Sequence, residues 1–234
     1  MKNLLFLLSV LFVTVSFGQK GDKERKKGDA KLVFKDYRGA IVDYNKAIEI
    51  DPTYVDAYVS RGIAKDDLED YRGAIADYNK AIDLDPESFG AYYNRGKAKN
   101  DLKDYKGAIE DYTKAIKLNP EYVDAYINRG RTKSNLQDNK GAKSDYTKAI
   151  ELDPTYADAY NNRGLAKYNL QDYSGAVADY TKAIKLDAEY VSAYYNRGVT
   201  KFNLSDIDGA CLDWTKAAEL GDTDADDMIK ENCN

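Results

Sequence analysis

The hydrophobic and polar positions of this chain follow one pattern that returns every 34 residues, as at Gly39, Gly73 and Gly107. Residues 89–122 show one full period. Its two halves each place small, aromatic or long side chains at helical spacing, namely Tyr92, Gly96, Lys99 and Leu102, then Ala108, Tyr112, Ala115 and Ile116. Positions three or four apart share one face of an α-helix. The period therefore predicts two short helices, with a turn at Lys103-Asp104.

The same period recurs along most of the chain. The Asn119-Pro120 step is expected to end a second helix, because the residue before proline avoids helical geometry and proline suits the first turn of the next helix. A fixed period of this length indicates a stacked array of one helix-turn-helix unit, which we interpret as a single domain. The six copies are residues 21–54, 55–88, 89–122, 123–156, 157–190 and 191–224.

Small and aromatic residues recur in register between the copies. Glycine inside a helix costs about 1 kcal/mol relative to alanine, so its repeated use predicts close approach between helices. The first-helix glycines are Gly28, Gly62, Gly96, Gly130, Gly164 and Gly198, and the matching second-helix alanines are Ala40, Ala74, Ala108, Ala142, Ala176 and Ala210. The aromatic stripe formed by Tyr44, Tyr78, Tyr112, Tyr146, Tyr180 and Trp214 is typical of core packing.

This pattern resembles the tetratricopeptide repeat (TPR) family. The third copy matches the family's sequence of aromatic, glycine, turn tyrosine, alanine, aromatic, alanine and proline at Tyr92, Gly96, Tyr105, Ala108, Tyr112, Ala115 and Pro120. The resemblance covers residues 21–224 in six copies and is very specific. It implies an all-α fold, an α-solenoid of six 34-residue helix-turn-helix repeats in a right-handed superhelix, whose first helices line a concave groove.

The chain departs from that family pattern at the residue before the first-helix glycine. Where leucine is usual, it has Lys27 in copy one and then Arg61, Arg95, Arg129, Arg163 and Arg197. A buried charge needs a partner. Asp111 is as far from the turn at Lys103 as Arg95 is, and as far from Pro120 as Arg129 is. We therefore expect each second-helix aspartate to lie between its own copy's arginine and the next, as a structural ladder.

The fourth copy is degenerate, and the end of the chain carries both cysteines. Asn139 replaces the turn tyrosine and Lys143 replaces an isoleucine, which predicts a soft point in the stack or, alternatively, a polar site on the outer surface. Cys211 and Cys233 lie equally far from Asp222, so they face each other if residues 225–234 form a C-terminal capping helix. We expect a disulfide there, with two separate thiols as the alternative.

The N-terminal sequence is typical of a secretory signal peptide. A lysine precedes an apolar run from Leu4 to Phe17, and small residues stand before a cleavage point between Gly18 and Gln19. Residues 1–18 are therefore predicted to be removed, giving a periplasmic or extracellular protein without membrane insertion. An uncleaved anchor is the alternative, although the run is shorter than the roughly 20 apolar residues of a membrane span.

Composition narrows the function classes. Removing residues 1–18 takes away one lysine, which leaves 34 Lys and Arg against 40 Asp and Glu and a net charge of −6, unfavourable for nucleic-acid binding. The chain has no histidine and no Gly-rich phosphate loop, and its carboxylates recur with the repeat, whereas a catalytic pair would be singular. We predict no enzyme activity, no metal site and no cofactor.

The copies differ on the groove face that the family resemblance implies. In copies two to four this face is largely charged or polar, whereas in copies five and six it is apolar and aromatic with neighbouring asparagines. The predicted partner-binding residues are Asn161, Leu165, Tyr168, Asn169, Tyr195, Val199, Phe202 and Asn203. Exposed aromatics beside amides suit an extended peptide. The alternative is that Tyr168 and Phe202 only pack on the next helix or on the cap.

These observations favour a non-catalytic protein–protein interaction scaffold, which binds a peptide segment or a partner protein in the groove after export. A second hypothesis is a self-associating structural repeat protein of the cell envelope. An enzyme or a small-ligand receptor, such as a glycan binder, would require a singular polar constellation that the sequence does not show.

Overall fold

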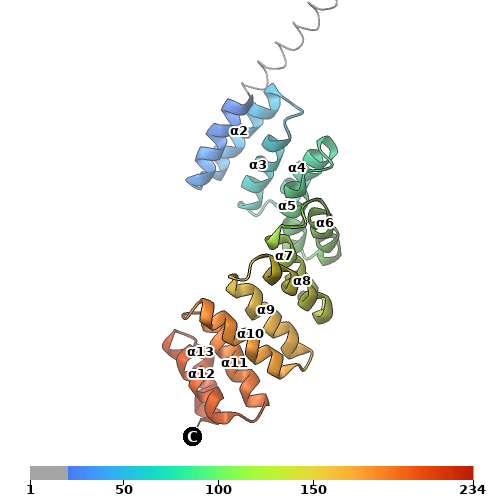
Figure 1. The fold of residues 1–234 in the computed structure, drawn as a ribbon. Coiled ribbons are helices and arrows are strands. Elements are labelled where there is room, and N and C mark those ends of the chain that lie inside the picture. Colours follow the sequence, from blue (N-terminus) through green and yellow to red (C-terminus); the bar gives the residue numbers. More distant parts are fainter. Residues whose placement is uncertain (1–20, 234) are drawn as a thin grey trace, which may run out of the picture. The chain divides into compact units, whose positions relative to one another are not determined.

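The chain forms helices grouped in two compact units, unit 1 (Met1–Pro120) and unit 2 (Glu121–Asn234). The computed structural model describes residues 21–233, and every element in that range is helical (Figure 1). The predicted signal peptide lies outside the described residues. Within residues 21–233, no helix has the length and apolar character needed to cross a membrane.

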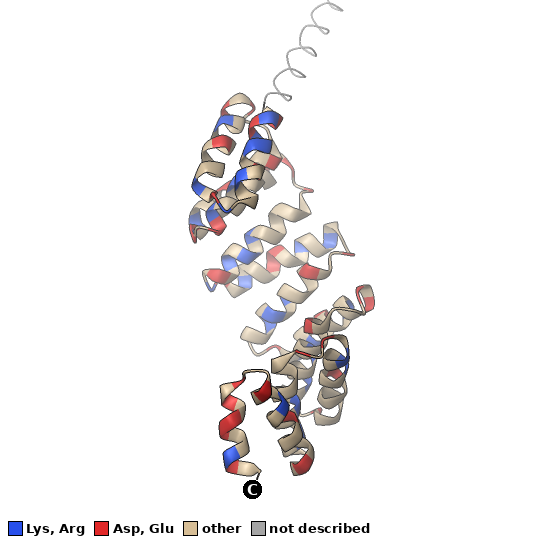
Figure 2. Ribbon diagram, turned by 90° about the vertical axis from the view of Figure 1, so that its left-hand side faces the viewer, with Lys and Arg blue, Asp and Glu red and all other residues tan. Residues whose placement is uncertain are grey.

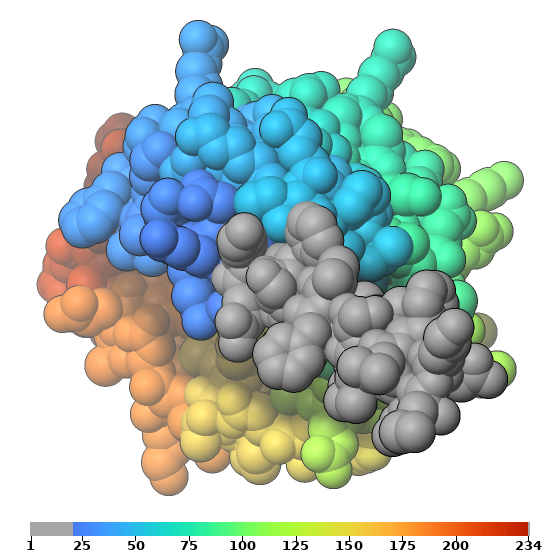
Figure 3. Space-filling view, turned by 90° about the horizontal axis from the view of Figure 1, so that it is seen from above, coloured from blue at the N-terminus to red at the C-terminus, as the bar shows by residue number. Residues whose placement is uncertain are grey.

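Unit 1 is a row of helical hairpins. Residues 21–33 are helical and precede α2 (Tyr37–Ile50), α3 (Val55–Asp66), α4 (Tyr71–Leu84), α5 (Phe89–Asp101) and α6 (Tyr105–Leu118). Each of α2 to α5 packs on the next helix, and the first helices α3 and α5 also touch each other. In the space-filling view, α2 and α3 pack without a gap, and long side chains project from unit 1 into solvent (Figure 3).

Unit 2 continues the same alternation and ends in the expected capping helix. Its helices are α7 (Val123–Asn135), α8 (Asn139–Leu152), α9 (Ala157–Asn169), α10 (Tyr173–Leu186), α11 (Val191–Asn203), α12 (Ile207–Glu219) and α13 (Thr223–Asn232). Consecutive helices pack together, and α7, α9 and α11 also contact one another in order. The periodicity thus predicted the repeat architecture correctly, because each first helix from α3 onward begins where a copy was placed.

An aspartate cap starts the second helix of every copy. In copy five, Asp172 accepts a hydrogen bond from the backbone N–H of Gly175 at 3.0 Å. The residue before the cap has a left-handed backbone, with φ of 63° at Gln171 and also at Lys103. A left-handed residue cannot continue a right-handed helix. This geometry explains why the predicted break at Lys103-Asp104 separates two helices, although no glycine stands there.

The first-helix glycines face aromatic rings rather than alanines. A Cβ placed on Gly164 would lie 2.7 Å from Cε1 of Tyr180, and one on Gly198 would lie 2.6 Å from Nε1 of Trp214. The expected close approach is therefore real, but its partner was misassigned. The second-helix alanines, such as Ala176, are fully buried elsewhere in the core. Glycine is needed because the ring of the same copy occupies the space that a side chain would take.

Each buried aspartate is held by two cations of its own copy. In copy five, Arg163 forms two parallel hydrogen bonds to Asp179, of 2.8 Å from Nε and 2.7 Å from Nη2. Lys167, one turn later, places Nζ 2.8 Å from the same carboxylate. The guanidinium also lies over the ring of Tyr160, 5.6 Å from its centroid. The same arginine–aspartate pairing recurs at Arg61–Asp77, Arg95–Asp111, Arg129–Asp145 and Arg197–Asp213.

The expected ladder is correct within copies and wrong in the step to the next copy. Arg61 turns its third nitrogen to the amide oxygen of Asn45, 2.6 Å away, instead of to Asp43. Asp43 pairs instead with Lys31 at 2.6 Å and Lys46 at 3.4 Å. Hairpin symmetry located the correct helix pair, but it missed the lysine, which lies one helical turn beyond the arginine.

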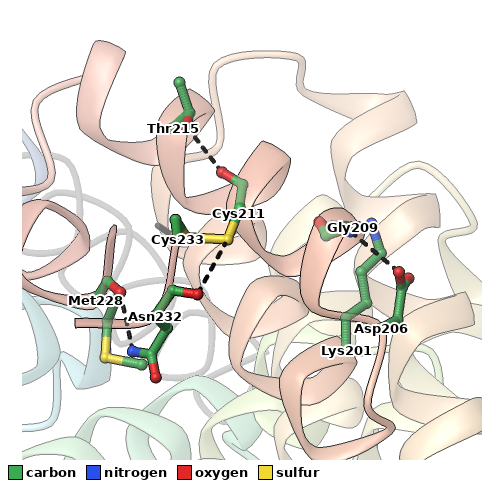
Figure 4. Close-up of a disulfide and its surroundings, with 8 residues drawn as sticks. All are labelled: Lys201, Asp206, Gly209, Cys211, Thr215, Met228, Asn232 and Cys233. Carbon is green, nitrogen blue, oxygen red and sulfur yellow. Dashed lines mark hydrogen bonds between the residues drawn. A yellow bond between two sulfur atoms is a disulfide. The ribbon is translucent and has the colours of Figure 1, made fainter. Parts of the chain in front are cut away.

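The cap is tied to the last copy by a disulfide. Cys211 of α12 and Cys233 at the end of α13 are bonded, 22 positions apart in the sequence (Figure 4). Asp222 caps α13 by accepting from the N–H groups of Asp224 and Ala225. Acidic residues follow along this helix near the C-terminal end (Figure 2). The bridge and the cap together hold α13 against α12.

Candidate functional site

The candidate site is the first-helix face of unit 2, which we define as the exposed side of α7, α9 and α11. These three helices lie side by side in the order of the copies. Their predicted partner-binding residues come from α9 and α11. Because each of these helices is fixed by the ion pairs and ring contacts behind it, the face is presented by a rigid support.

In copy five, the structure separates buried from accessible members of the predicted set. Asn161 is only 7% exposed and accepts a hydrogen bond from Nδ2 of Asn196 at 3.3 Å. Leu165, one turn later, is 40% exposed. Tyr168 is half-buried, and its ring lies 5.4 Å from that of Tyr173. Leu165 is thus accessible to a partner, while Asn161 joins α9 to α11.

In copy six, the capping helix takes part of the predicted surface. Tyr195 and Val199 pack against the cluster around Trp214, to which Met228 and Ile229 of α13 also belong. Burial raises the pKa of Tyr195, and the nearby carboxylates of Asp224 and Asp222 raise it further. Both residues are therefore partly buried against a cluster that includes Ala225 of α13.

Phe202 and Asn203 are the last two residues of α11, and both are exposed. Phe202 is 37% exposed, and its ring lies 5.8 Å from that of Trp214. Asn203 donates Nδ2 to the hydroxyl of Tyr168 at 3.1 Å and to the carbonyl of Val199 at 2.9 Å. Phe202 therefore packs on Trp214, as the alternative interpretation expected, and more than a third of its surface remains exposed to solvent.

A charged cluster borders the same face. Asp158 lies 3.4 Å from Nη2 of Arg131 and accepts a hydrogen bond of 2.5 Å from the hydroxyl of Tyr190. Burial raises the pKa of Tyr190, and the hydrogen bond to Asp158 raises it further. This tyrosine therefore stays a neutral donor to Asp158 at physiological pH.

A polar cleft opens on this face where copy four is degenerate. It has a volume of about 380 Å³ and is lined by Ser134, Gln137, Asn139 and Asn169. Nδ2 of Asn169 approaches the amide oxygen of Asn139 at 3.4 Å. From the sequence, Asn139 was expected to mark a soft point in the stack or, alternatively, a polar site on the outer surface, and neither prediction included Ser134, Gln137 or Asn169. The signal available was the presence of small polar residues in copy four at the two positions that hold Tyr168 and Tyr173 in copy five.

The corresponding face of unit 1 is charged. Asp66 lies 3.8 Å from Nζ of Lys97, and its Oδ1 is buried without a hydrogen-bond partner. Burial raises the pKa of Asp66, and the negative charges of Asp101 and Asp67 raise it further, whereas the positive charge of Lys97 lowers it. Charged groups of copies two and three therefore lie on the first-helix face of unit 1, whereas the face of unit 2 carries the exposed Leu165 and Phe202 as well as the Arg131–Asp158 pair.

Known families and structures share this architecture. Residues 90–122 match the tetratricopeptide repeat family, and residues 34–65, 67–102, 135–171 and 166–205 match the TPR repeat family. No curated protein matches the chain. Among solved structures, MamA is 31% identical, and the match covers 69% of this chain and 95% of MamA, with a TM-score of 0.65.

Two further solved structures share the fold at lower identity. YrrB, described as a TPR protein with an unusual peptide-binding site, is 24% identical over 80% of this chain and 97% of its own, with a TM-score of 0.70. The PilF protein of Pseudomonas aeruginosa is 20% identical over 92% of this chain and 99% of its own, with a TM-score of 0.80. These likenesses extend over nearly the whole length of YrrB and of PilF.

Proposed function

Because this chain belongs to the tetratricopeptide repeat family, we propose that it is a non-catalytic scaffold that binds a peptide segment of a partner protein on the first-helix face of unit 2. The family and the fold indicate a role in protein interaction. YrrB is an example of this fold with a peptide-binding site. The location on unit 2 and the extended form of the bound segment are parts of the proposal.

The observation that carries the proposal is the exposure of apolar side chains beside amides. Leu165 and Phe202 are 40% and 37% exposed on adjacent first helices. Asn169 lies one helical turn after Leu165, and Asn203 directly follows Phe202. Apolar side chains supply area that is removed from water on binding, and amides satisfy the backbone of an extended segment. In unit 1, several of the corresponding positions are charged, namely Lys97 and Asp101 of copy three and Asp66 and Asp67 of copy two.

Export is the second part of the proposal. The disulfide between Cys211 and Cys233 is compatible with an oxidising compartment, in which such bonds persist. We infer cleavage between Gly18 and Gln19 and a periplasmic or extracellular location. Mass spectrometry of the protein purified from cell-envelope and culture fractions should give a chain that begins at Gln19. A chain recovered from the cytosol with residues 1–18 intact would contradict this part alone.

The binding site is tested by capture from an envelope extract. The mature chain serves as bait beside a Leu165→Ala, Phe202→Ala variant, which removes only accessible apolar groups. Tyr195 is left unchanged, because it packs in the Trp214 cluster and its loss would damage the fold. We expect a partner that the wild type retains and that this variant binds at least tenfold more weakly, since apolar anchors dominate interface energies.

The matched control for that experiment is Leu212→Ala. Leu212 is 73% exposed, but it lies on the second helix α12. The control should retain the partner at wild-type affinity. Equal capture by all three proteins would place recognition elsewhere and would contradict the proposed face.

Self-association is a second candidate function, favoured by an apolar patch in copy one. Val33 and Phe34, at the end of the first helix, are 79% and 84% exposed. The corresponding residues of copy two are Asp67 and Leu68. If the chain associates through this patch, sedimentation velocity will show a mass that rises with protein concentration. A Val33→Asp, Phe34→Leu double variant, which introduces the residues of copy two, will abolish this rise. A constant monomer mass would exclude this function.

A further inference from the structure

The polar cleft of copy four lies where copy five packs two aromatic rings against each other. In copy five, the corresponding positions hold Tyr168 and Tyr173, whose ring centroids lie 5.4 Å apart. In copy four they hold Ser134 and Asn139, which are too small to fill the same volume. Copy four therefore has a cleft of about 380 Å³ in the place where copy five has a pair of packed rings.

The lining of the cleft is polar but uncharged. Three of its four residues, Gln137, Asn139 and Asn169, have carboxamide side chains, and Ser134 adds a hydroxyl. Within residues 21–233, the only hydrogen bond among these side chains is the contact of 3.4 Å from Asn169 to Asn139. The Oδ1 atom of Asn169, the Nδ2 atom of Asn139 and the whole carboxamide of Gln137 are left for water or a ligand.

This lining discriminates between ligand groups. A carboxylate or an ammonium group that entered the cleft would lose water and find no opposite charge on the four lining residues. An apolar group would displace water from the amides and leave them unsatisfied. A primary carboxamide offers two donors and one acceptor, which can pair with the donors and acceptors of lining carboxamides in both directions.

We propose that the cleft formed by Ser134, Gln137, Asn139 and Asn169 is a subsite for the carboxamide side chain of an asparagine or glutamine in the bound peptide. This inference rests on the proposed function and adds a sequence preference to it. The rest of the first-helix face supplies the second element of that preference, because Phe202 lies on the next first helix beyond Asn169.

The spacing of the helices sets the spacing of the motif. Packed helices lie about 8–10 Å apart, and an extended peptide advances about 3.3 Å per residue. The step from Asn169, on the α9 side of the cleft, to Phe202 on α11 therefore corresponds to about three peptide residues. The preferred ligand has a carboxamide residue about three positions from an apolar residue.

The test uses fluorescein-labelled nonapeptides with an alanine–serine background. Each carries leucine at one fixed position and glutamine, glutamate, lysine or leucine three positions away, on either side. Fluorescence anisotropy with the mature chain should show about tenfold tighter binding of a glutamine peptide than of the other three, the size expected when buried polar groups are left unpaired.

A Ser134→Tyr, Asn139→Tyr variant fills the cleft with the residues that copy five uses. It should fold, because the same pair packs in copy five, and a thermal midpoint at or above that of the wild type will verify this. It should lose the preference for glutamine and keep its affinity for the leucine-only peptide. Asn135→Ala is the control, since Asn135 lies on the same helix and does not line the cleft.

The outcomes separate the cleft from the proposed function. Two results would refute the carboxamide subsite and leave the proposed binding face intact. One is equal affinity of the wild type for all four peptides, and the other is a preference for glutamine that remains in the Ser134→Tyr, Asn139→Tyr variant. Failure of the wild type to bind any of the peptides overturns both. In a parallel NMR titration, N-acetylglutamine methylamide should shift the side-chain amide signals of Asn139 and Asn169. A response to N-acetylglucosamine alone would instead identify a sugar site and overturn the peptide assignment.

Discussion

Copies four and five of unit 2 share one framework and present different surfaces. Both hold a buried aspartate, Asp145 or Asp179, between an arginine and a lysine of their own first helix. Their second helices have the same length and the same aspartate cap. They differ where the first helix ends, since copy five packs two tyrosine rings there and copy four leaves a polar cleft.

The comparison shows that architecture and surface are encoded at separate positions. The loss of the turn tyrosine at Asn139 did not shorten α8, because Asp138 caps it and Tyr146 and Asp145 anchor it. The end of the first helix can therefore vary without loss of the stack. The following variants test this separation, beginning with the framework.

The largest effect is expected from Asp179→Ala. It leaves Arg163 and Lys167 largely buried without their carboxylate, and breaking a buried ion pair typically costs about 3–5 kcal/mol. Asp43→Ala is the comparison in copy one, where Lys31 and Lys46 are half-exposed and can regain water, so we expect about 1 kcal/mol. Urea unfolding of both variants measures the difference. Equal losses would show that the two networks are equivalent, contrary to the structure.

A smaller loss is expected when the glycine beside a buried ring is changed. Gly164→Ala places a Cβ 2.7 Å from the buried ring of Tyr180, and overpacking of this kind costs about 1–3 kcal/mol, partly offset by the better helix propensity of alanine. Gly90→Ala is the matched control, because a Cβ there meets nothing within 4 Å. The control should be neutral or slightly stabilising. A stable Gly164→Ala variant, by thermal unfolding, would mean that Tyr180 moves aside readily.

The smallest effect concerns the charged face of unit 1 and depends on pH. Burial raises the pKa of Asp66, so its contribution to stability is present below the ordinary value of 3.8 and is lost as pH rises through the raised value. Asp66→Asn should therefore slightly increase the urea midpoint at pH 7 and leave it unchanged near pH 3. Asp67→Asn, at an exposed neighbour, serves as the control. A decrease at pH 7 would mean that the ion pair with Lys97 outweighs burial.

Local features of the sequence were enough to place the helices. The predicted turn at Lys103-Asp104 separates the two helices of a copy, and the periodic glycines mark the contact between them, so the bounds of the repeats followed from spacing. The caps formed by Asp104 and Asp172 were not predicted. The partner of Gly164 did not follow, because periodicity identifies a face but not the side chain that fills it. For the same reason, the second cation beside Asp179 escaped prediction.

For the candidate site, the sequence predicted the set of residues and the contrast between early and late copies. It could not predict that Asn161 accepts a hydrogen bond from Asn196, or that Tyr195 and Val199 pack against the buried cluster around Trp214. These contacts join residues of different helices, and their geometry depends on how each hairpin packs on the next. The accessible part of the set is therefore smaller than the predicted part.

By itself, the sequence determined the repeat, its helices and the facing positions of Cys211 and Cys233, because each of these depends on residues at fixed separations along the chain. Only the tertiary structure decided which groups remain exposed. The cleft at Asn139 arises from residues of two copies that meet across neighbouring helices, and its volume depends on what the side chains around it do not fill. The periodicity of the sequence specifies which residues share a helix face, whereas the packing of side chains between helices decides which of them remain accessible and where a cleft is left.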